Sequence, residues 1–405
     1  MSASTSAETM NDVDLTAPMF SFAAFGTLAA VHSSEEQADF VATAYKPDGA
    51  GFSNSWSGKV DSLIAGQVTG TFSPHVSAVV QVVAEQSHDG AFQPHVEWAN
   101  FRYQFSPDLS LTFGRTALPT FTHNDSRKVG YSLPWVRPPV EVYDLAPITS
   151  NDGLGVIYQR RIGSATNTLQ LTGGWSVSKF PGGRIGAGEA KARELLSIAD
   201  THEWGFAMLH VNFGRTRVSI AALEPLFAAL RQFGPPGEAL ADKYEVNDAL
   251  VSFMGLGAGY NPGEWFVQAE WGHLDSSSLL GAKTGWYVSG GIRFGTLTPY
   301  LNYADVRPTG RTFEAGLDLA SLPANLQDPA AQLNGALNSA LSGIPRQATY
   351  TLGARWDFMR NVAFKLQYDQ IALGRDSVGT LLNVQPGLRR GGTVHLFSAS
   401  LDFVL

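Results

Sequence analysis

The stretch EWANFRYQFSPDLS, Glu97–Ser110, contains the pattern that decides the fold. In its first nine residues Ala99, Phe101, Tyr103 and Phe105 alternate with polar residues, which gives a strand one apolar and one polar face. A Ser-Pro-Asp break follows. Such residues favour a tight turn, because they combine a fixed backbone angle with a side-chain hydrogen-bond acceptor. The stretch therefore predicts a strand that ends in a hairpin.

The same unit recurs along the chain. FSPHVS at Phe72–Ser77 repeats the break of FSPDLS at Phe105–Ser110, and the alternation returns in TYTLGARWDF at Thr349–Phe358. Counting such runs predicts sixteen strands, among them strands at 203–214 and 217–224 preceded by a long loop at 177–202. Short breaks follow every second strand and longer loops follow the others. The expected sheet is antiparallel, with short turns at one end and long loops at the other.

An open sheet of this size would expose unpaired backbone groups at its edges, and closing it into a barrel removes the edges. The face expected to point inward is polar, so we expect a wet interior and an apolar exterior that contacts lipid. The predicted fold class is all-β: a sixteen-stranded antiparallel transmembrane β-barrel with short periplasmic turns and long outer loops. The inward polar residues used for this assignment are Gln81, Gln104, Arg217, Gln268, Arg293 and Lys365.

Aromatic residues supply a second indication of a membrane. Six of them are expected just before short turns, where a girdle of aromatic side chains marks a membrane interface. A soluble β-sandwich or propeller is the alternative, but it would bury its aromatic face, and its loops would not divide into two length classes. The six aromatic residues are Phe72, Phe105, Phe213, Tyr260, Phe294 and Phe358.

Composition limits the other classes. Only 16% of the 405 residues are charged, whereas about a quarter is typical of soluble domains. A net charge of -8 argues against nucleic acid as a partner. The chain has no cysteine, and its nine histidines are scattered without metal-ligand spacing, so we expect no metal and no cofactor. Residues 1–17 are interpreted as a flexible polar tail, and 18–405 as the barrel domain.

The chain resembles the trimeric porins of Gram-negative bacteria over nearly its full length. SFAAFGTLAAV at Ser21–Val31 is similar to their first strand, and FSASLDFVL at Phe397–Leu405 to their closing strand. The resemblance implies a homotrimer in the bacterial outer membrane, in contact with lipid or lipopolysaccharide. It also implies a third outer loop, here residues 116–152, that folds inward and forms the constriction. Small side chains in the first strand are expected to allow close approach between barrels: Ala23, Ala24, Gly26, Ala29 and Ala30.

Charged residues are expected at this constriction. Charges in a confined passage are screened less than surface charges, so a small excess of basic groups predicts a weak preference for anions. The alternative is that these charges are solvated or paired with one another. Prolines around Trp135 favour a stiff loop. The expected basic residues are Arg102, Arg115, Arg127, Lys128, Arg137 and Lys365, and the expected acidic ones are Asp125, Glu141, Asp144 and Asp369.

The expected function is passive diffusion of small hydrophilic solutes and ions, without enzymatic activity. Three alternatives stay open: a porin that prefers small carboxylates, an outer-membrane enzyme, and a structural barrel whose lumen is plugged. No Ser/His/Asp set stands out in the sequence. Separately, leucines at helical spacing in an outer loop predict a short helix at the pore mouth or at a subunit contact: Leu326, Leu333, Leu337 and Leu341.

Overall fold

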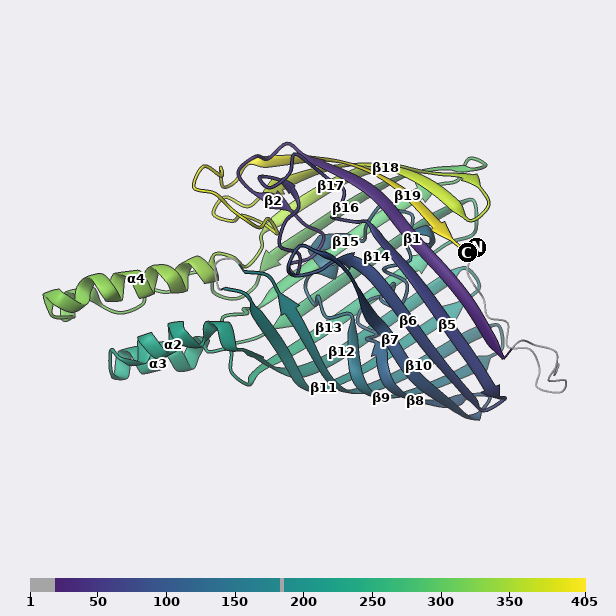
Figure 1. Cartoon of the computed structure of the whole chain (residues 1–405), viewed down its shortest axis with the longest axis horizontal. Helices are drawn as coiled ribbons and strands as arrows, with labels where there is room; N and C mark the ends of the chain where they lie inside the picture. The colour runs from purple at the N-terminus through teal and green to yellow at the C-terminus, as the bar shows by residue number, and fades with distance from the viewer. Residues whose placement is uncertain (1–18, 183–185) are drawn as a thin grey trace.

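The structure is a computed structural model that describes residues 19–182 and 186–405, and it is a closed β-barrel (Figure 1). Each long strand pairs antiparallel with the next along the chain, and β1 pairs with both β5 and β19, which closes the barrel. The predicted sixteen-stranded fold is confirmed. The predicted tail, residues 1–17, lies outside the described residues. The wall strands are β1 (Phe20–Ser33), β5 (Leu63–Ser73), β6 (Val76–Gln86), β7 (Phe92–Ser106), β8 (Leu109–Ala117), β9 (Ser150–Ile162), β10 (Ala165–Phe180), β11 (Gly188–Trp204), β12 (Ala207–Ile220), β13 (Ala249–Tyr260), β14 (Trp265–Asp275), β15 (Lys283–Ile292), β16 (Leu297–Pro308), β17 (Gln347–Met359), β18 (Val362–Leu373) and β19 (Thr393–Val404).

The two ends of the barrel differ as predicted. Tight turns such as 107–108 and 163–164 join strands at one end, whereas the connections 34–62, 118–149 and 309–346 lie at the other. The described chain begins with β1 and finishes with β19 at the short-turn end, where Val404 N donates to Asn361 O. Minor elements lie in the long connections: β2 (Asp39–Phe40), β3 (Ala50–Gly51), β4 (Trp56–Ser57), η1 (Gly130–Ser132), α1 (Val140–Tyr143), η2 (Ala221–Leu223) and η3 (Leu319–Ser321).

The outward face of the wall is apolar. Phe22, Leu28 and Leu301 are exposed by 77%, 63% and 64%, an arrangement that water would penalise and lipid would accept. Five of the six predicted girdle residues lie next to short turns and are exposed. Phe213 is the exception, because it lies in the middle of β12.

One pair of strands was placed wrongly from the sequence. The predicted strand at 203–214 spans a hairpin turn at Gly205, which adopts a φ of 57°, and β12 continues without a break through Arg215 and Thr216. β11 fills most of the predicted loop at 177–202. The count of sixteen was still right, because one strand was missed and another was split.

The structure shows why β11 escaped detection. Near its start, buried Ala192 alternates with Lys191 and Arg193, which are exposed on the outer face. The usual pattern of apolar outward and polar inward residues is therefore absent there. The register then shifts between Arg193 and Leu196, around Glu194 with a φ of 49°. A bulge adds a residue and breaks the period of two on which the prediction depended.

The prediction that the inward face of the strands is polar was wrong in two places. Arg217 lies on the outer face of β12, where it forms ion pairs with Glu194 at 3.3 Å and Asp248 at 3.0 Å. Inward positions near the long-loop ends of β12–β14 are buried and apolar: Val218, Val251, Phe253 and Leu274. They are apolar because an inward-folded loop packs against them.

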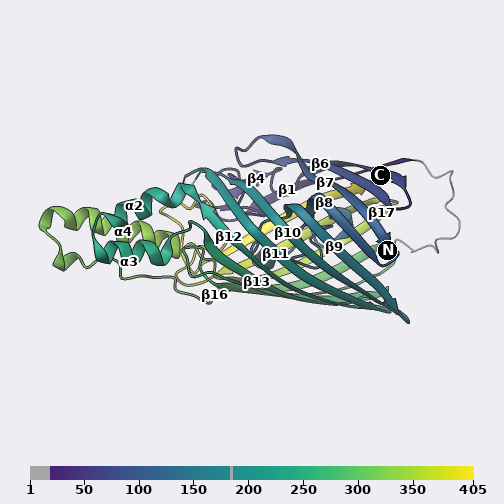
Figure 2. The same ribbon diagram turned by 90° about the horizontal axis from the view of Figure 1, so that it is seen from below.

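Three helices project from the long-loop end (Figures 1 and 2): α2 (Glu224–Arg231), α3 (Pro235–Tyr244) and α4 (Ala324–Leu341). Their shared core contains the buried Phe227, Leu230, Tyr244, Leu337 and Leu341. The helix predicted from leucine spacing is confirmed as α4, and it lies in this projection rather than across the opening. Among the described residues, every helix is too short or too polar to cross a membrane.

Candidate functional site: an inward-folded loop beside a charged passage

Residues 118–149, called L3 here, connect β8 to β9 and fold into the barrel. Phe121, Leu133, Trp135, Val142 and Tyr143 of L3 are buried in one cluster with side chains of the inner wall. Trp135 Nε1 also donates to Ser289 Oγ on β15 at 2.9 Å. L3 therefore shares a packed core with the inner wall of the barrel, and the predicted inward-folded third loop is confirmed.

Glycines let L3 lie directly on its supports. A Cβ at Gly285 on β15 would lie 2.2 Å from Glu141 O of L3, and a Cβ at Gly130 in L3 would lie 2.2 Å from Asp402 Oδ1 on β19. Contacts this short leave no room for any side chain, so backbone and wall approach each other closely only because both positions are glycine.

Lys365 attaches L3 to the barrel wall. It is fully buried on β18, and its Nζ donates to the backbone oxygens of Gly130 and Trp135, both at 2.7 Å. The same ammonium forms an ion pair with Asp402 at 2.9 Å. The prediction that Lys365 faces the opening was therefore wrong: it fastens the loop.

Arg137 is a second attachment point. Its guanidinium forms ion pairs with Asp61 at 2.6 Å and with Asp369 at 3.2 Å, and it donates to Ser398 Oγ at 2.6 Å. Burial alone would lower the pKa of Arg137, but the two carboxylates outweigh that effect and raise its pKa above the usual value. Arg137 thus links L3 both to Asp61, in the connection that precedes β5, and to the wall strands β18 and β19, and its charge is neutralised there.

Lys128 and Glu141 complete the attachment. Lys128 forms ion pairs with Glu85 on β6 and with Glu97 on β7, the latter at 2.9 Å. Burial would lower the pKa of Lys128, and these carboxylates instead raise it. Glu141 accepts hydrogen bonds from Thr349 Oγ1 and from Gln347 Nε2 at 2.7 Å, while its burial raises its pKa. L3 is tied to opposite sides of the barrel.

A cavity of about 420 Å³, called the charged passage here, lies between L3 and the wall of β5–β10. Arg127 is its distinctive residue. Among the described residues its Nη1 has no hydrogen-bond partner, and its guanidinium lies 5.5 Å from the ring centroid of Tyr143. The lining includes the basic Lys46, Arg115, Arg127, Lys128, Arg137 and Lys179 and the acidic Asp61, Glu85, Glu97 and Asp152.

The remaining expected site residues differ in their positions relative to the charged passage. Arg115 lines the passage but makes a double hydrogen bond to Asp152, at 2.9 and 2.7 Å. Arg102 lies nearer the short-turn end of β7 and donates to Ser110 Oγ at 3.0 Å. Asp125 is exposed and lines neither this passage nor the second cavity described below. The structure thus gathers Arg115, Arg127, Lys128 and Arg137 around one opening and separates them from the rest.

Comparison with known proteins identifies the architecture. No protein-family model and no curated protein sequence matches the chain. Among solved structures, OmpF of Salmonella typhi, in a complex with daunomycin, is 11% identical with a TM-score of 0.55, over 95% of this chain and 97% of that one. An anion-selective porin from Comamonas acidovorans is 10% identical with a TM-score of 0.54, over 95% and 99%. In-vitro folded OmpT of Vibrio cholerae, in a trimer form, is 10% identical with a TM-score of 0.50, over 96% and 100%. The chain has the porin fold.

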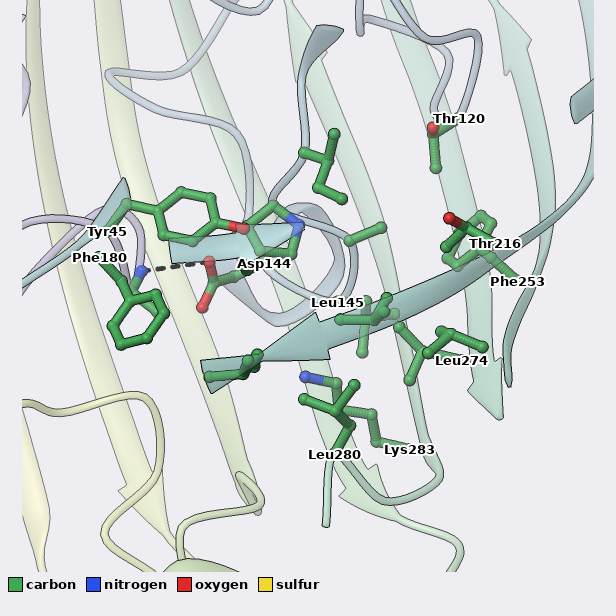
Figure 3. Close-up of a pocket in the computed structure, with 18 of the residues that line it drawn as sticks. Tyr45, Thr120, Asp144, Leu145, Phe180, Thr216, Phe253, Leu274, Leu280 and Lys283 are labelled. Atoms are coloured by element: carbon green, nitrogen blue, oxygen red, sulfur yellow. Dashed lines mark hydrogen bonds between the residues drawn. The ribbon is translucent and has the colours of Figure 1, made fainter. Parts of the chain in front are cut away.

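Within this porin fold a second cavity lies on the other side of L3. It measures about 770 Å³ and lies between L3 and the wall of β10–β15 (Figure 3); we call it the apolar chamber. Asp144, expected at the constriction, lies here instead. Sequence analysis missed the chamber. The feature that could have indicated it is the run of apolar inward residues at one end of three neighbouring strands, β12–β14. The chamber's apolar lining includes Leu118, Leu145, Ile148, Phe180, Leu195, Val218, Val251, Phe253, Leu274 and Leu280.

Proposed function

We propose that the protein is an outer-membrane porin, a passive diffusion channel for small hydrophilic solutes and ions. The observation that carries the proposal is the charged passage beside an immobilised L3, inside a closed barrel with an apolar exterior. A closed barrel pairs all its backbone groups internally, which is what a lipid environment requires. A loop fastened by buried ion pairs keeps an opening at constant width, as a diffusion channel needs.

The proposed setting is the bacterial outer membrane, with the short turns toward the periplasm and lipid or lipopolysaccharide around the apolar band. A homotrimer is part of this proposal, and the trimer form of the similar OmpT structure supports it. The small residues available for contact are fewer than expected from the sequence. Ala24 and Ala30 share the outward face of β1 with Phe22, whereas Ala23 and Ala29 share the inward face, and the Phe403 ring lies 2.6 Å from a Cβ position on Gly26.

Planar-bilayer recording tests the channel. We expect stepwise conductance from the purified, folded protein, because the charged passage is lined by ionised side chains that keep it hydrated. The plugged barrel is the alternative that the extensive packing of L3 favours. A preparation that inserts, retains its strand content and yet conducts no current would contradict the porin proposal in favour of a plug. Hydrolysis of lipid or peptide substrates by the same preparation would favour an enzyme.

Selectivity is proposed to favour anions weakly, because the lining of the charged passage contains more basic than acidic residues. We expect Arg127→Ser to shift the reversal potential in a salt gradient toward cations, since Arg127 Nη1 has no partner among the described residues that would neutralise its effect. Arg311→Ser is the matched control, because the Arg311 side chain is 72% exposed on a long outer connection. An equal reversal potential in wild type and Arg127→Ser would place the selectivity at other residues.

A further inference from the structure

The apolar chamber is unusual for the interior of a barrel proposed to pass hydrophilic solutes. Val218, Phe253 and Leu274 form its wall on β12, β13 and β14, and Leu145 of L3 faces them (Figure 3). Its volume of about 770 Å³ lies within the range of small-molecule sites, which typically combine apolar walls with a few polar groups. Water gains little from such walls, whereas an apolar group that replaces it is stabilised.

Three charged residues line the same chamber: Asp144, Lys283 and Arg215. Arg215 has the same parity on β12 as the outward Arg217, so the two charges of opposite sign that concern us are those of Lys283 and Asp144. Lys283 begins β15 beside its cross-strand neighbour Leu274, and its side chain extends toward the part of the chamber where Asp144 lies (Figure 3). Within the described part of the chain, Lys283 Nζ has neither a hydrogen bond nor an ion pair. Asp144 Oδ1 accepts from Thr43 Oγ1 at 3.2 Å and from Ala44 N at 3.3 Å, and no described cation forms an ion pair with the carboxylate.

Both charged side chains are partly buried. Burial raises the pKa of Asp144, while the charge of Lys283 partly opposes that rise, so the two groups interact across the chamber without contact. Burial also raises the pKa of Tyr45, another lining residue, to about 12. A partly buried charge without an ion-pair partner carries a desolvation cost, and a ligand that brings the missing counter-charge offsets that cost.

We propose that the apolar chamber binds a small zwitterion with an apolar side chain, of the α-amino acid class. The ligand's carboxylate would meet the Lys283 ammonium, its ammonium the Asp144 carboxylate, and its side chain the apolar wall. An organic anion would satisfy Lys283 and be repelled by Asp144, and an organic cation would do the reverse. Only a zwitterion supplies a partner for each charge.

The chamber lies next to the charged passage, because Tyr45 and Pro147 line both cavities. The inference rests on the proposed function in one respect, because selection of this solute class presupposes a channel. The channel would select the solute by binding it beside the route of permeation. Binding itself does not require conduction. A binding experiment and a conductance experiment can therefore fail independently.

The test is calorimetric titration of the folded protein in detergent with four probes: L-phenylalanine, glycine, 3-phenylpropanoate and 2-phenylethylamine. We expect phenylalanine to bind most tightly, and each of the others about tenfold or more weaker, because each lacks the apolar group or one of the two charges. Phenylalanine binding no more tightly than glycine would overturn the proposal, as would tightest binding of either singly charged probe.

Two variants separate a role in recognition from damage to the fold. Lys283→Met is expected to remove the preference for phenylalanine over 2-phenylethylamine, and Asp144→Asn the preference over 3-phenylpropanoate, since each variant deletes the partner of one ligand charge. Lys191→Met is the control, with a side chain 58% exposed on β11, and it should bind like wild type. Unchanged preferences in both variants would overturn the assignment. A conducting protein that does not bind phenylalanine would overturn only this inference, and a binding protein without conductance only the channel.

Discussion

Replacing Lys365 with methionine is expected to lower the free energy of unfolding by about 3–5 kcal/mol, because it leaves the buried Asp402 carboxylate without a cation. Asp402 would keep hydrogen bonds from Thr27 Oγ1 at 2.5 Å and Ser400 Oγ at 3.1 Å, which do not neutralise its charge. The backbone oxygens of Gly130 and Trp135 would lose their shared donor as well. Denaturant unfolding in detergent, followed by tryptophan fluorescence, measures the change.

The same substitution should increase the open-channel noise and the conductance, because L3 loses its attachment to β18 and β19. Lys59→Met is the matched control, with a side chain 48% exposed. Adding Asp402→Asn to Lys365→Met should recover part of the lost stability, since the unpaired charge disappears, while the noise persists. Wild-type unfolding and wild-type current in Lys365→Met would show that other contacts alone hold the loop.

The barrel could be predicted because its wall has one face toward lipid and one toward the lumen. Residues of a strand point to the two faces in turn, so the polarity of the sequence alternates with a period of two. Stretches such as Glu97–Phe105 need no distant partner to be interpreted. The prediction failed where the outer face is not apolar, at Lys191 and Arg193 of β11, and where Glu194 interrupts the period. A local sequence pattern therefore predicts a strand only where the outer face is apolar, the inner face is polar and no bulge interrupts the period of two.

The candidate site was less predictable, because the state of each charge depends on residues far away in the sequence. Lys365 contacts a loop residue 235 positions earlier, and Glu141 contacts Thr349, 208 positions later. Sequence analysis named charged residues of L3 but missed three of the carboxylates that pair with them, namely Asp61, Glu85 and Glu97. Half of the ten charged residues expected to act on ions instead fasten the loop, namely Lys128, Arg137, Lys365, Glu141 and Asp369.

In the channel that we propose, this use of charge would make the passage both rigid and selective. Ion pairs of Arg137 and Lys128 with the wall are shielded from water, so added salt screens them less than surface pairs. These ion pairs hold L3 at fixed positions. The proposed anion preference then depends on charged groups that are not paired with the wall, of which Arg127 is the clearest. Removing a fastening charge should therefore have larger consequences than removing Arg127.

Among the charges that fasten L3 to the wall, we expect the largest effect from removing Arg137, as in Arg137→Leu. It leaves both Asp61 and Asp369 without their cation, so we expect the free energy of unfolding to fall by about 3–5 kcal/mol. Since Asp61 lines the charged passage, the reversal potential should also move toward cations, by more than in Arg127→Ser. Denaturant unfolding and bilayer recording of the same preparation measure both effects.

Charge pairing and shape can be separated at this residue. Arg137→Leu combined with Asp61→Asn and Asp369→Asn keeps the altered shape but removes both unpaired carboxylates, so it should be more stable than Arg137→Leu alone and should lose the added preference for cations. Arg311→Leu, at an exposed position, controls for the loss of an arginine. If the triple variant is no more stable than the single one, Arg137 supports L3 through packing, such as its contact 5.1 Å above the Phe40 ring, rather than through its charge.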